Sequence, residues 1–507
     1  MTKIFSCTFS GLDCQIIEVE ADISNGLPKF HIVGLGDASV QEAKERVRAS
    51  IRNAGAEFPY KRKVVNLAPA EIRKQGTHFD LAIAISLLLA SDQIPAQFFE
   101  KAILIGELSL TGKVKPVHGI LPLTQYAKSQ GFKRIFLPES NALEASYIKD
   151  IEIFPVVKFK DLINYSRGDT KMEVFKNANQ INLEKISEEN NFEGFLNIVG
   201  LEKAKRALII AATGGHNVFL EGSPGCGKTI LARAFRDLLP SMTTSEMLET
   251  TKIFSVSGQL DLEKPIIKER PFREVHHTAS VASVIGGGIR SPKPGEISLA
   301  HNGVLFFDEI SEFPRKILES LRQPLEDKYI NINRSRFYSR FPSNFLFIAT
   351  TNPCPCGYYN DSKVNCTCTL GHINQYQKRL SGPILDRFDI FLEIPRIPIH
   401  QAMKNPQTDG LRQFIDKIEK VRKKQYQRFS DYKGIRQNSD MQLKHIKEFC
   451  EMEKSAEILL EKANKKLNLS NRAYLKTLKV ARTIADLDGR ELIGDGHVAE
   501  AVQYRRR

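Results

Sequence analysis

The sequence lacks any apolar run of the roughly eighteen residues that a membrane-spanning helix needs. Its first residues, Met1–Phe5, carry no secretory pattern, and the chain has no internal repeat or low-complexity tract. These absences argue against membrane, secreted and repeat proteins, and we expect a cytoplasmic protein. Hydrophobic residues still make up 42% of the 507 residues, which is enough for about three domains with sizeable cores.

Cysteine is sparse outside one short segment. Four of the eight cysteines are scattered, and a cytoplasmic protein is not expected to pair them as disulfides. The others form two C-x-C pairs separated by nine residues: Cys354, Cys356, Cys366 and Cys368. Four thiolates suit a tetrahedral structural zinc, although C-x-C is less usual than C-x-x-C. The alternative is a loop of four thiols without a metal.

Acidic residues are too few to balance the basic ones. The net charge is +14, and residues 401–507 alone hold 24 lysines and arginines against 15 aspartates and glutamates. This balance favours a polyanionic partner such as a nucleic acid, with an ordinary basic surface as the alternative.

The strand and helix patterns divide the chain into four parts and predict an α/β multidomain protein. Residues 1–165 mix strands and helices, as in an α+β domain. Residues 166–192 are polar and without a period, and we expect a linker there. Residues 193–395 alternate strand and helix patterns, which predicts a doubly wound parallel sheet. Residues 396–507 show helical spacing only and predict a helical domain.

A complete phosphate-binding loop stands between a predicted strand and a predicted helix. Its residues are Gly222, Ser223, Pro224, Gly225, Cys226, Gly227, Lys228 and Thr229. The glycines let backbone N–H groups surround a triphosphate, and the helix adds the positive end of its dipole. Lys228 is expected to bind the β- and γ-phosphates, and Thr229 to ligate Mg²⁺. A chance glycine-rich turn is the alternative, and the flanking elements argue against it.

Two carboxylates follow a fully apolar strand pattern at Val304–Phe307. Such a run suits a strand buried on both faces of a parallel sheet, where ligands bind at the carboxyl ends. Asp308 is expected to hold Mg²⁺ through water, and Glu309 to polarise the attacking water. Acidic pairs also cap helices, but together with the phosphate loop they predict hydrolysis of a nucleotide.

Three further polar residues are candidates for the same site. Asn352 ends another apolar strand pattern and is expected to bind the attacking water or the γ-phosphate, unless it only starts the turn before Pro353. Arg387 is a candidate arginine finger for a neighbouring subunit, with a surface ion pair to Asp386 or Asp389 as the alternative. Arg472 lies in the first turn of a helix that Ser470 is expected to cap. It is a candidate nucleotide-sensing arginine, or else a solvated one.

Residues 327–340 predict a β-hairpin that carries both basic and aromatic side chains. Its basic residues are Lys328, Arg334, Arg336 and Arg340, interleaved with Tyr329, Phe337 and Tyr338. Basic groups contact phosphates and aromatic rings stack on bases, so we expect the hairpin to bind DNA. The alternative is a solvated hairpin whose aromatic rings belong to the core.

Together these motifs resemble the magnesium-chelatase-like AAA+ ATPases. The likeness lies in His276–Thr278, Gly286–Gly288, Pro292, Pro294–Gly303, Thr351–Gly357 and Leu385–Phe388. Three N-terminal segments narrow it to the ComM (YifB-like) subfamily over essentially the whole chain: Gly34–Asp37, Asn66–Ala70 and Phe79–Leu81. Residues Ile332–Ser335 depart from the Ile-Ser-Arg-Ala usual in that family.

The resemblance implies a homohexameric DNA motor that uses ATP and Mg²⁺. Its expected activity is branch migration of recombination intermediates during natural transformation, with Asn352 and Arg472 at the sensor 1 and sensor 2 positions and a C-terminal helical lid. Fold does not fix substrate, so a remodeller of protein complexes is the alternative.

The first domain also resembles the proteolytic domain of Lon, through Gly106–Val114 and Pro116–Gly119. Proteolysis of that type needs a serine nucleophile activated by a lysine. The serine position falls at His78 and the lysine position at Leu121, and neither side chain can do this chemistry. We therefore expect a structural or DNA-guiding domain and no protease.

Overall fold

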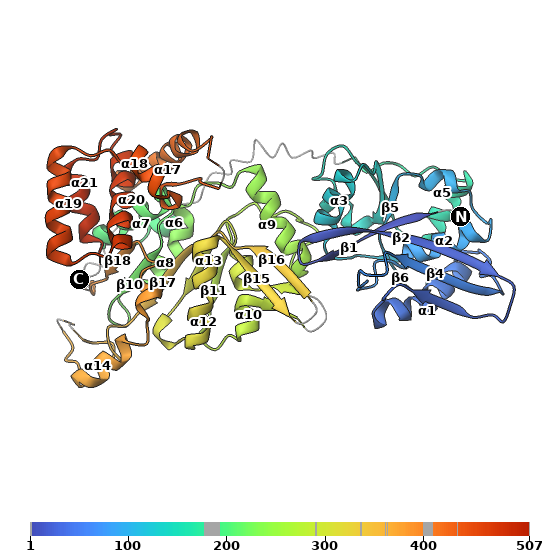
Figure 1. Cartoon of the computed structure of the whole chain (residues 1–507), viewed down its shortest axis with the longest axis horizontal. Helices are drawn as coiled ribbons and strands as arrows, with labels where there is room; N and C mark the ends of the chain where they lie inside the picture. The colour runs from blue at the N-terminus through green and yellow to red at the C-terminus, as the bar shows by residue number, and fades with distance from the viewer. Residues whose placement is uncertain are drawn as a thin grey trace.

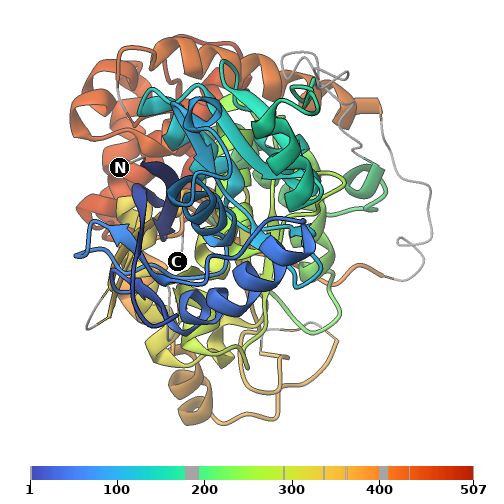
Figure 2. The ribbon, with the colours of Figure 1, turned by 90° about the vertical axis from the view of Figure 1, so that its right-hand side faces the viewer.

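The computed structural model describes residues 3–176, 193–288, 292–334, 337–359, 361, 363–398, 409–432 and 434–505. The molecule is elongated, with the N-terminal domain at one end, the helical lid at the other and the nucleotide-binding core between them (Figure 1). The view down the long axis from the N-terminal end shows this domain in front of the core (Figure 2). Most of the predicted linker, 177–192, lies outside the described residues.

The N-terminal domain is built on a seven-stranded mixed sheet in the order β3-β4-β2-β1-β5-β8-β9. Pairs β1–β2 and β2–β4 are antiparallel, and the other pairs are parallel. The strands are β1 (Ile4–Ser10), β2 (Asp13–Ser24), β3 (Phe30–Val33), β4 (Arg62–Ala68), β5 (Ala102–Leu104), β8 (Arg134–Pro138) and β9 (Glu152–Val156). The short strands β6 (Glu107–Leu108) and β7 (Val114–Lys115) form a separate hairpin.

Four longer helices accompany this sheet: α1 (Ala38–Asn53), α2 (Asp80–Ala90), α3 (Ile120–Ser129) and α5 (Phe159–Arg167). Helix α2 is apolar on nearly every side, and all its residues but the last are buried. Beyond α5, the N–H of Phe175 donates to the carbonyl of Ile153 at 2.8 Å. A residue beyond α5 therefore still binds the sheet of the N-terminal domain.

The two positions that would carry a Lon-type dyad are buried. The ring of His78 packs at a tilt against that of Phe79, with ring centroids 4.1 Å apart, and Leu121 is inaccessible to solvent. Burial lowers the pKa of His78 to about 4, so the imidazole is neutral at pH 7. Neither side chain is a nucleophile that a peptide could approach.

The core holds a five-stranded parallel sheet in the order β11-β14-β17-β10-β18. Its strands are β11 (Phe272–Val275), β14 (Val304–Phe307), β17 (Leu346–Thr351), β10 (Val218–Glu221) and β18 (Ile390–Glu393). Strand β14 is buried at every residue, as its unbroken apolar run predicted. The doubly wound α/β fold predicted from the sequence is confirmed.

The helices of the core precede or connect these strands. They are α6 (Glu193–Leu196), α7 (Glu202–Gly214), α8 (Lys228–Ala234), α9 (Thr244–Ser257), α10 (Val281–Ile285), α11 (Glu296–Leu299), α12 (Arg315–Ser320), α13 (Arg322–Asp327), α14 (Leu370–Gln377) and α15 (Gly382–Leu385). Two hairpins project from the core: β12 (Gly286–Gly287) with β13 (Lys293–Pro294), and β15 (Tyr329–Arg334) with β16 (Phe337–Pro342).

The described residues of the C-terminal domain, 409–432 and 434–505, form helices joined by loops and no strand. Its helices are α17 (Asp409–Arg428), α18 (Leu443–Phe449), α19 (Lys454–Leu467), α20 (Asn471–Leu487) and α21 (Asp495–Gln503). Ser470 caps α20 by accepting from the N–H of Ala473, as predicted. One hydrophobic cluster runs from β10 and α7 into this domain, so the lid packs directly on the core.

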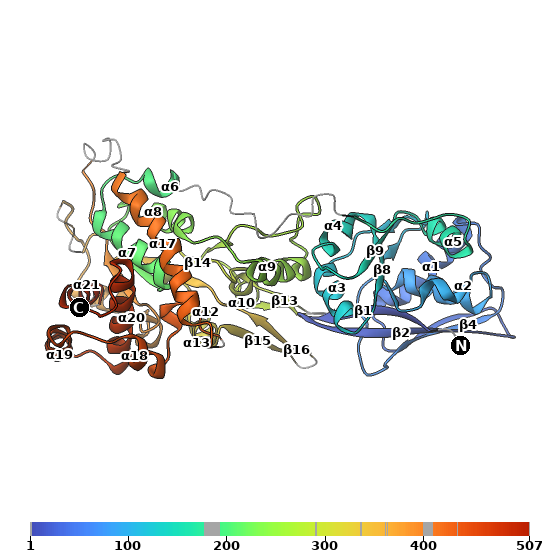
Figure 3. The same cartoon turned by 90° about the horizontal axis from the view of Figure 1, so that it is seen from above.

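The N-terminal domain meets the core through α3 and α9 (Figure 3). There the hydroxyl of Ser255 donates to the Glu144 carboxylate at 2.5 Å, and the N–H of Gly119 donates to the Ser255 carbonyl at 3.2 Å. A second contact joins Gly11, in the turn between β1 and β2, to Ser339 on β16. A Cβ at Gly11 would lie 2.8 Å from that of Ser339, so the two backbones approach closely.

Candidate nucleotide site

The phosphate loop follows β10, and its last two residues, Lys228 and Thr229, begin α8. Gly225 and Gly227 adopt φ of +74° and +94°, a conformation that favours glycine. The ammonium of Lys228 donates to the carbonyls of Gly222 at 2.6 Å and Ser223 at 3.1 Å, and to Oδ1 of Asn352 at 3.1 Å. Burial lowers the pKa of Lys228. The expected phosphate ligand and the expected sensor residue are thus in contact.

The two expected magnesium ligands also meet. The hydroxyl of Thr229 donates to Oδ2 of Asp308 at 3.0 Å, and the hydroxyl of Thr350 binds the other carboxylate oxygen. Strands β10, β17 and β14 are parallel neighbours, so the residues that follow them share one edge of the sheet. A hydroxyl and a carboxylate beside a phosphate loop are the oxygen ligands that Mg²⁺ prefers. These residues fit a magnesium ion.

Glu309 stands in a left-handed backbone conformation, with φ of 52°. Its N–H donates to the hydroxyl of Thr350 at 2.9 Å, and its side chain is exposed. A non-glycine residue held in this conformation costs about 1–3 kcal/mol, and such strain gathers at functional sites. The turn leaves the carboxylate free to solvent next to Asp308.

The two arginine candidates lie together at the opposite edge of the sheet. Asn217 precedes β10, and its side chain donates to the carbonyl of Arg387 at 3.0 Å. Arg387 therefore sits at the amino edge, whereas the phosphate loop sits at the carboxyl edge. Nitrogens of Arg387 and Arg472 lie 2.7 and 2.5 Å from the same oxygen of Glu326. The alternative reading, a surface ion pair of Arg387 with Asp386 or Asp389, does not hold, because the carboxylate that Arg387 contacts is that of Glu326.

The four clustered cysteines converge after β17. The Sγ atoms of Cys354, Cys356 and Cys366 lie 3.4 to 3.7 Å apart, and all four, including Cys368, lie within 4.8 Å of one another. Tetrahedral zinc with Zn–S bonds of about 2.3 Å holds its sulfurs about 3.8 Å apart. A hydrogen bond from the backbone N–H of Tyr358 lowers the pKa of Cys356 to about 5, which favours the thiolate. The cluster can hold a metal ion.

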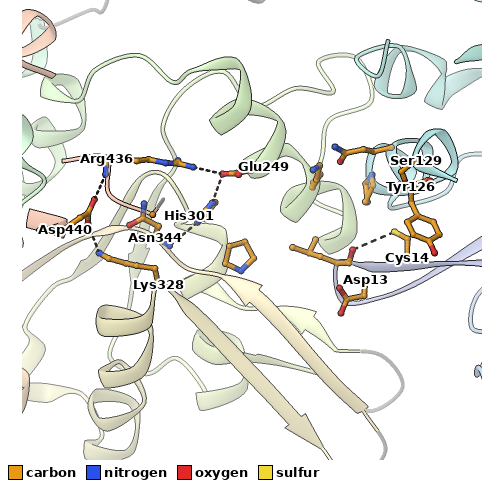
Figure 4. Close-up of a pocket in the computed structure, with 16 residues that line it drawn as sticks. Asp13, Cys14, Tyr126, Ser129, Glu249, His301, Lys328, Asn344, Arg436 and Asp440 are labelled. Carbon is orange, nitrogen blue, oxygen red and sulfur yellow. Dashed lines mark hydrogen bonds and ion pairs between the residues drawn. The ribbon is translucent and has the colours of Figure 1, made fainter. Parts of the chain in front are cut away.

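The predicted hairpin is present, and its base is tied to the lid. Nζ of Lys328 lies 4.0 Å from Oδ1 of Asp440, beside a cavity of about 690 Å³ between the three domains (Figure 4). The guanidinium of Arg340 lies 3.5 Å from the ring centroid of Tyr329. Tyr338 is 61% exposed, as a ring available for stacking should be. Arg334 ends β15, its side chain is not described, and Arg336 lies outside the described residues.

Sequence reasoning missed a cavity of about 890 Å³ beside the phosphate loop. Its lining includes Gly200, Leu201, Gly222, Ser223, Tyr359 and Asp361. The size is within the range of ligand sites, and its contact with the phosphate loop suits the base and ribose of a nucleotide. The sequence feature that could have indicated this cavity is the apolar segment Ile198–Leu201 before α7. Its last two residues, Gly200 and Leu201, adopt the left-handed backbone conformation.

Comparison with protein families assigns three parts of the chain. Residues 194–402 match the family described as "Magnesium chelatase, subunit ChlI". Residues 19–141 match "Subunit ChlI of Mg-chelatase", and residues 412–505 match "Magnesium chelatase, subunit ChlI C-terminal".

No helix of the described residues is long and apolar enough to cross a bilayer.

Several curated proteins match this chain over nearly their whole length. "Competence protein ComM" of Haemophilus influenzae is 40% identical over 505 residues, covering 99% of this chain and 97% of its own. The YifB protein of Escherichia coli is 38% identical over 498 residues, covering 98% and 95%. A magnesium-chelatase 67 kDa subunit of Heliobacterium mobile is 28% identical over 254 residues, which cover 44% of this chain and 37% of its own.

Proposed function

The chain belongs to the ComM (YifB-like) subfamily of magnesium-chelatase-like AAA+ ATPases, and from this premise we propose that it is an ATP-driven DNA motor. It would form a homohexamer that moves branched recombination intermediates during natural transformation. Its relative from Haemophilus influenzae is named a competence protein, and this name supports DNA as the partner.

The observation that carries the proposal is the meeting of five predicted residues at one edge of the core sheet: Lys228, Thr229, Asp308, Glu309 and Asn352. Lys228 would exchange its loop carbonyls for phosphate oxygens. Thr229 and Asp308 would hold Mg²⁺, which when bound neutralises charge on the β- and γ-phosphates. Glu309 would accept a proton from the attacking water, and Asn352 would help to orient that water.

The arginines support a site shared between subunits. Arg387 and Arg472 lie at the sheet edge opposite the phosphate loop, so neither would serve the nucleotide of its own chain. In a closed head-to-tail ring this edge would face the neighbour's phosphate loop. Both guanidinium groups would then stabilise the charge that develops on the γ-phosphate.

The hairpin β15–β16 supports contact with DNA. It carries both an exposed aromatic ring, that of Tyr338, and the cationic side chain of Arg340, which lies over Tyr329. Its base at Lys328 contacts Asp440 of the lid, so a lid that responds to nucleotide would move the hairpin. The net charge of +14 favours the same polyanionic partner. We assign zinc to the four thiolates as a structural ion.

A branch-migration assay on a synthetic four-way junction tests the function. Wild-type protein with ATP and Mg²⁺ should move the branch point and separate the junction into duplex products. Lys228→Ala protein, and wild type without ATP, should leave the junction unchanged. Hydrolysis of ATP without movement of any junction would contradict the DNA motor and favour a remodeller of protein complexes. A wild-type rate in Lys228→Ala protein would contradict the ATP site itself.

A further inference from the structure

The segment that carries the four thiols packs directly against the phosphate loop. An added Cβ at Gly357 would lie 2.5 Å from both Cδ and Cγ of Pro224, the third residue of the phosphate loop. Gly357 itself has φ of +84°. Only glycine allows this approach, because any side chain would both strain the backbone and push Pro224 away.

Polar contacts join the same two segments. Asp361 lies between two of the cysteines in sequence, and a hydrogen bond from the Ser223 hydroxyl lowers the pKa of its carboxyl. Nε of Arg396 lies 3.5 Å from Asp361, whose side chain is 3% exposed. The same guanidinium donates to the carbonyl of Pro224 at 3.3 Å. Asp361 therefore fixes the phosphate loop both directly and through Arg396.

Tyr359 links the metal ligands to the nucleotide cavity. Its backbone N–H donates to Sγ of Cys354 at 3.3 Å, and its side chain lines the cavity with Gly222 and Ser223. The described residues between 352 and 369 form no helix or strand. Without regular backbone hydrogen bonds, this segment depends on its cross-links for a fixed shape. A metal ion held by four thiolates supplies such cross-links at a free energy large enough to fold a small loop.

We infer that the metal held by Cys354, Cys356, Cys366 and Cys368 fixes one wall of the nucleotide site, so that metal occupancy sets the affinity for ATP. The inference rests on the proposed ATPase function. Tyr359 and Asp361 are the positioning residues that carry the effect from the thiolates to the phosphate loop. The ion takes no part in hydrolysis, since four protein ligands fill a tetrahedral site.

The experiment measures binding of a fluorescent ADP analogue to the full-length protein in three states. These are the protein as purified with its zinc content measured, the protein after removal of zinc by a chelator, and the stripped protein with zinc restored. The Kd should rise about tenfold or more on removal, as expected when a hydrogen bond to a charged group is lost, and should return with zinc. An unchanged Kd in the stripped protein overturns the inference.

Two variants keep the test decisive if stripping unfolds the protein. Asp361→Ala should retain its zinc yet bind the ADP analogue about tenfold more weakly, the loss of one hydrogen bond to a charged group. Cys14→Ser, a matched change in a half-exposed thiol of the N-terminal domain, should alter neither zinc nor Kd. Wild-type affinity in Asp361→Ala overturns the inference. A zinc-dependent Kd in a protein that never hydrolyses ATP would instead overturn the proposed function alone.

Discussion

Arg387 and Arg472 are held by one carboxylate oxygen of Glu326, at 2.7 and 2.5 Å. Arg387 precedes the last strand of the core, and Arg472 opens a helix of the lid. Two guanidinium groups so close together repel each other unless an anion lies between them. Glu326 fills that place within one chain, and a neighbour's γ-phosphate could fill it in a ring.

Two inactive variants should therefore restore activity to each other. Arg387→Ala should slow ATP hydrolysis by about 10³-fold or more, the effect of removing an arginine finger, and Lys228→Ala should abolish it. In mixed rings some sites combine an intact Lys228 with an intact Arg387, so steady-state hydrolysis should reappear. Arg315→Ala, an exposed arginine on α12, serves as the control and should hydrolyse normally. No recovery at any mixing ratio would contradict a shared site.

Glu309→Gln should separate nucleotide binding from hydrolysis. The amide keeps the size of the side chain but cannot accept a proton from water, so turnover should fall by about 10²-fold or more. Affinity for ATP should stay near that of wild type, because Lys228 and Thr229 are untouched. Equilibrium binding and single-turnover hydrolysis on the same sample measure both. Hydrolysis at the wild-type rate would show that another group activates the water.

Local sequence patterns predicted the elements of the site better than its side-chain partners. The phosphate loop and Asp308 could be found because a strand, a turn and a polar residue are contiguous in sequence. The contacts of Arg472 with Glu326, and of Lys328 with Asp440, join distant segments and depend on how the lid packs. The alternative partner that sequence proximity offered Arg387, Asp389 two residues away, is instead buried against Lys476 at 2.7 Å.

The contact of Phe175 with the N-terminal sheet and the nucleotide cavity were not predicted, for a related reason. Phe175 joins the edge strand β9 through a backbone hydrogen bond that no side-chain pattern reveals. Tyr359 and Asp361 lie in an irregular loop, where neither helical nor strand periodicity shows which side chains face a ligand. The cysteine spacing indicated a metal there, but only the contact of Gly357 with Pro224 relates it to the phosphate loop.

The hairpin should show two different effects when its basic residues are removed. Arg340→Gln should weaken DNA binding and reduce the salt slope of log K by about one, as for a lost phosphate contact. Lys328→Ala should instead leave DNA affinity nearly unchanged but reduce the DNA-stimulated rate of ATP hydrolysis, because it breaks the tie to Asp440. Asp440→Asn should reproduce the Lys328 effect. Salt titrations of DNA binding that give the same slope for all three variants would contradict this division.

His78 should make the N-terminal domain sensitive to acid. Its pKa is about 4 in the folded chain, mainly because of burial, against about 6.5 when unfolded. Between these values the unfolded chain binds more protons, so the stabilisation is complete above pH 6.5 and is lost as the pH falls toward 4. The loss approaches about 3 kcal/mol at the acid end.

The variant His78→Gln removes this titration while keeping a hydrogen-bond donor for the carbonyl of Cys7, with which the imidazole bonds. Hydrogen exchange of the α2 amides, corrected for the intrinsic effect of pH, reports the local free energy of opening. Wild type should lose protection between pH 7 and 4.5, and His78→Gln should lose much less. Identical pH dependence in the two proteins would mean that folding does not shift the pKa of His78, which its burial beside Phe79 argues against.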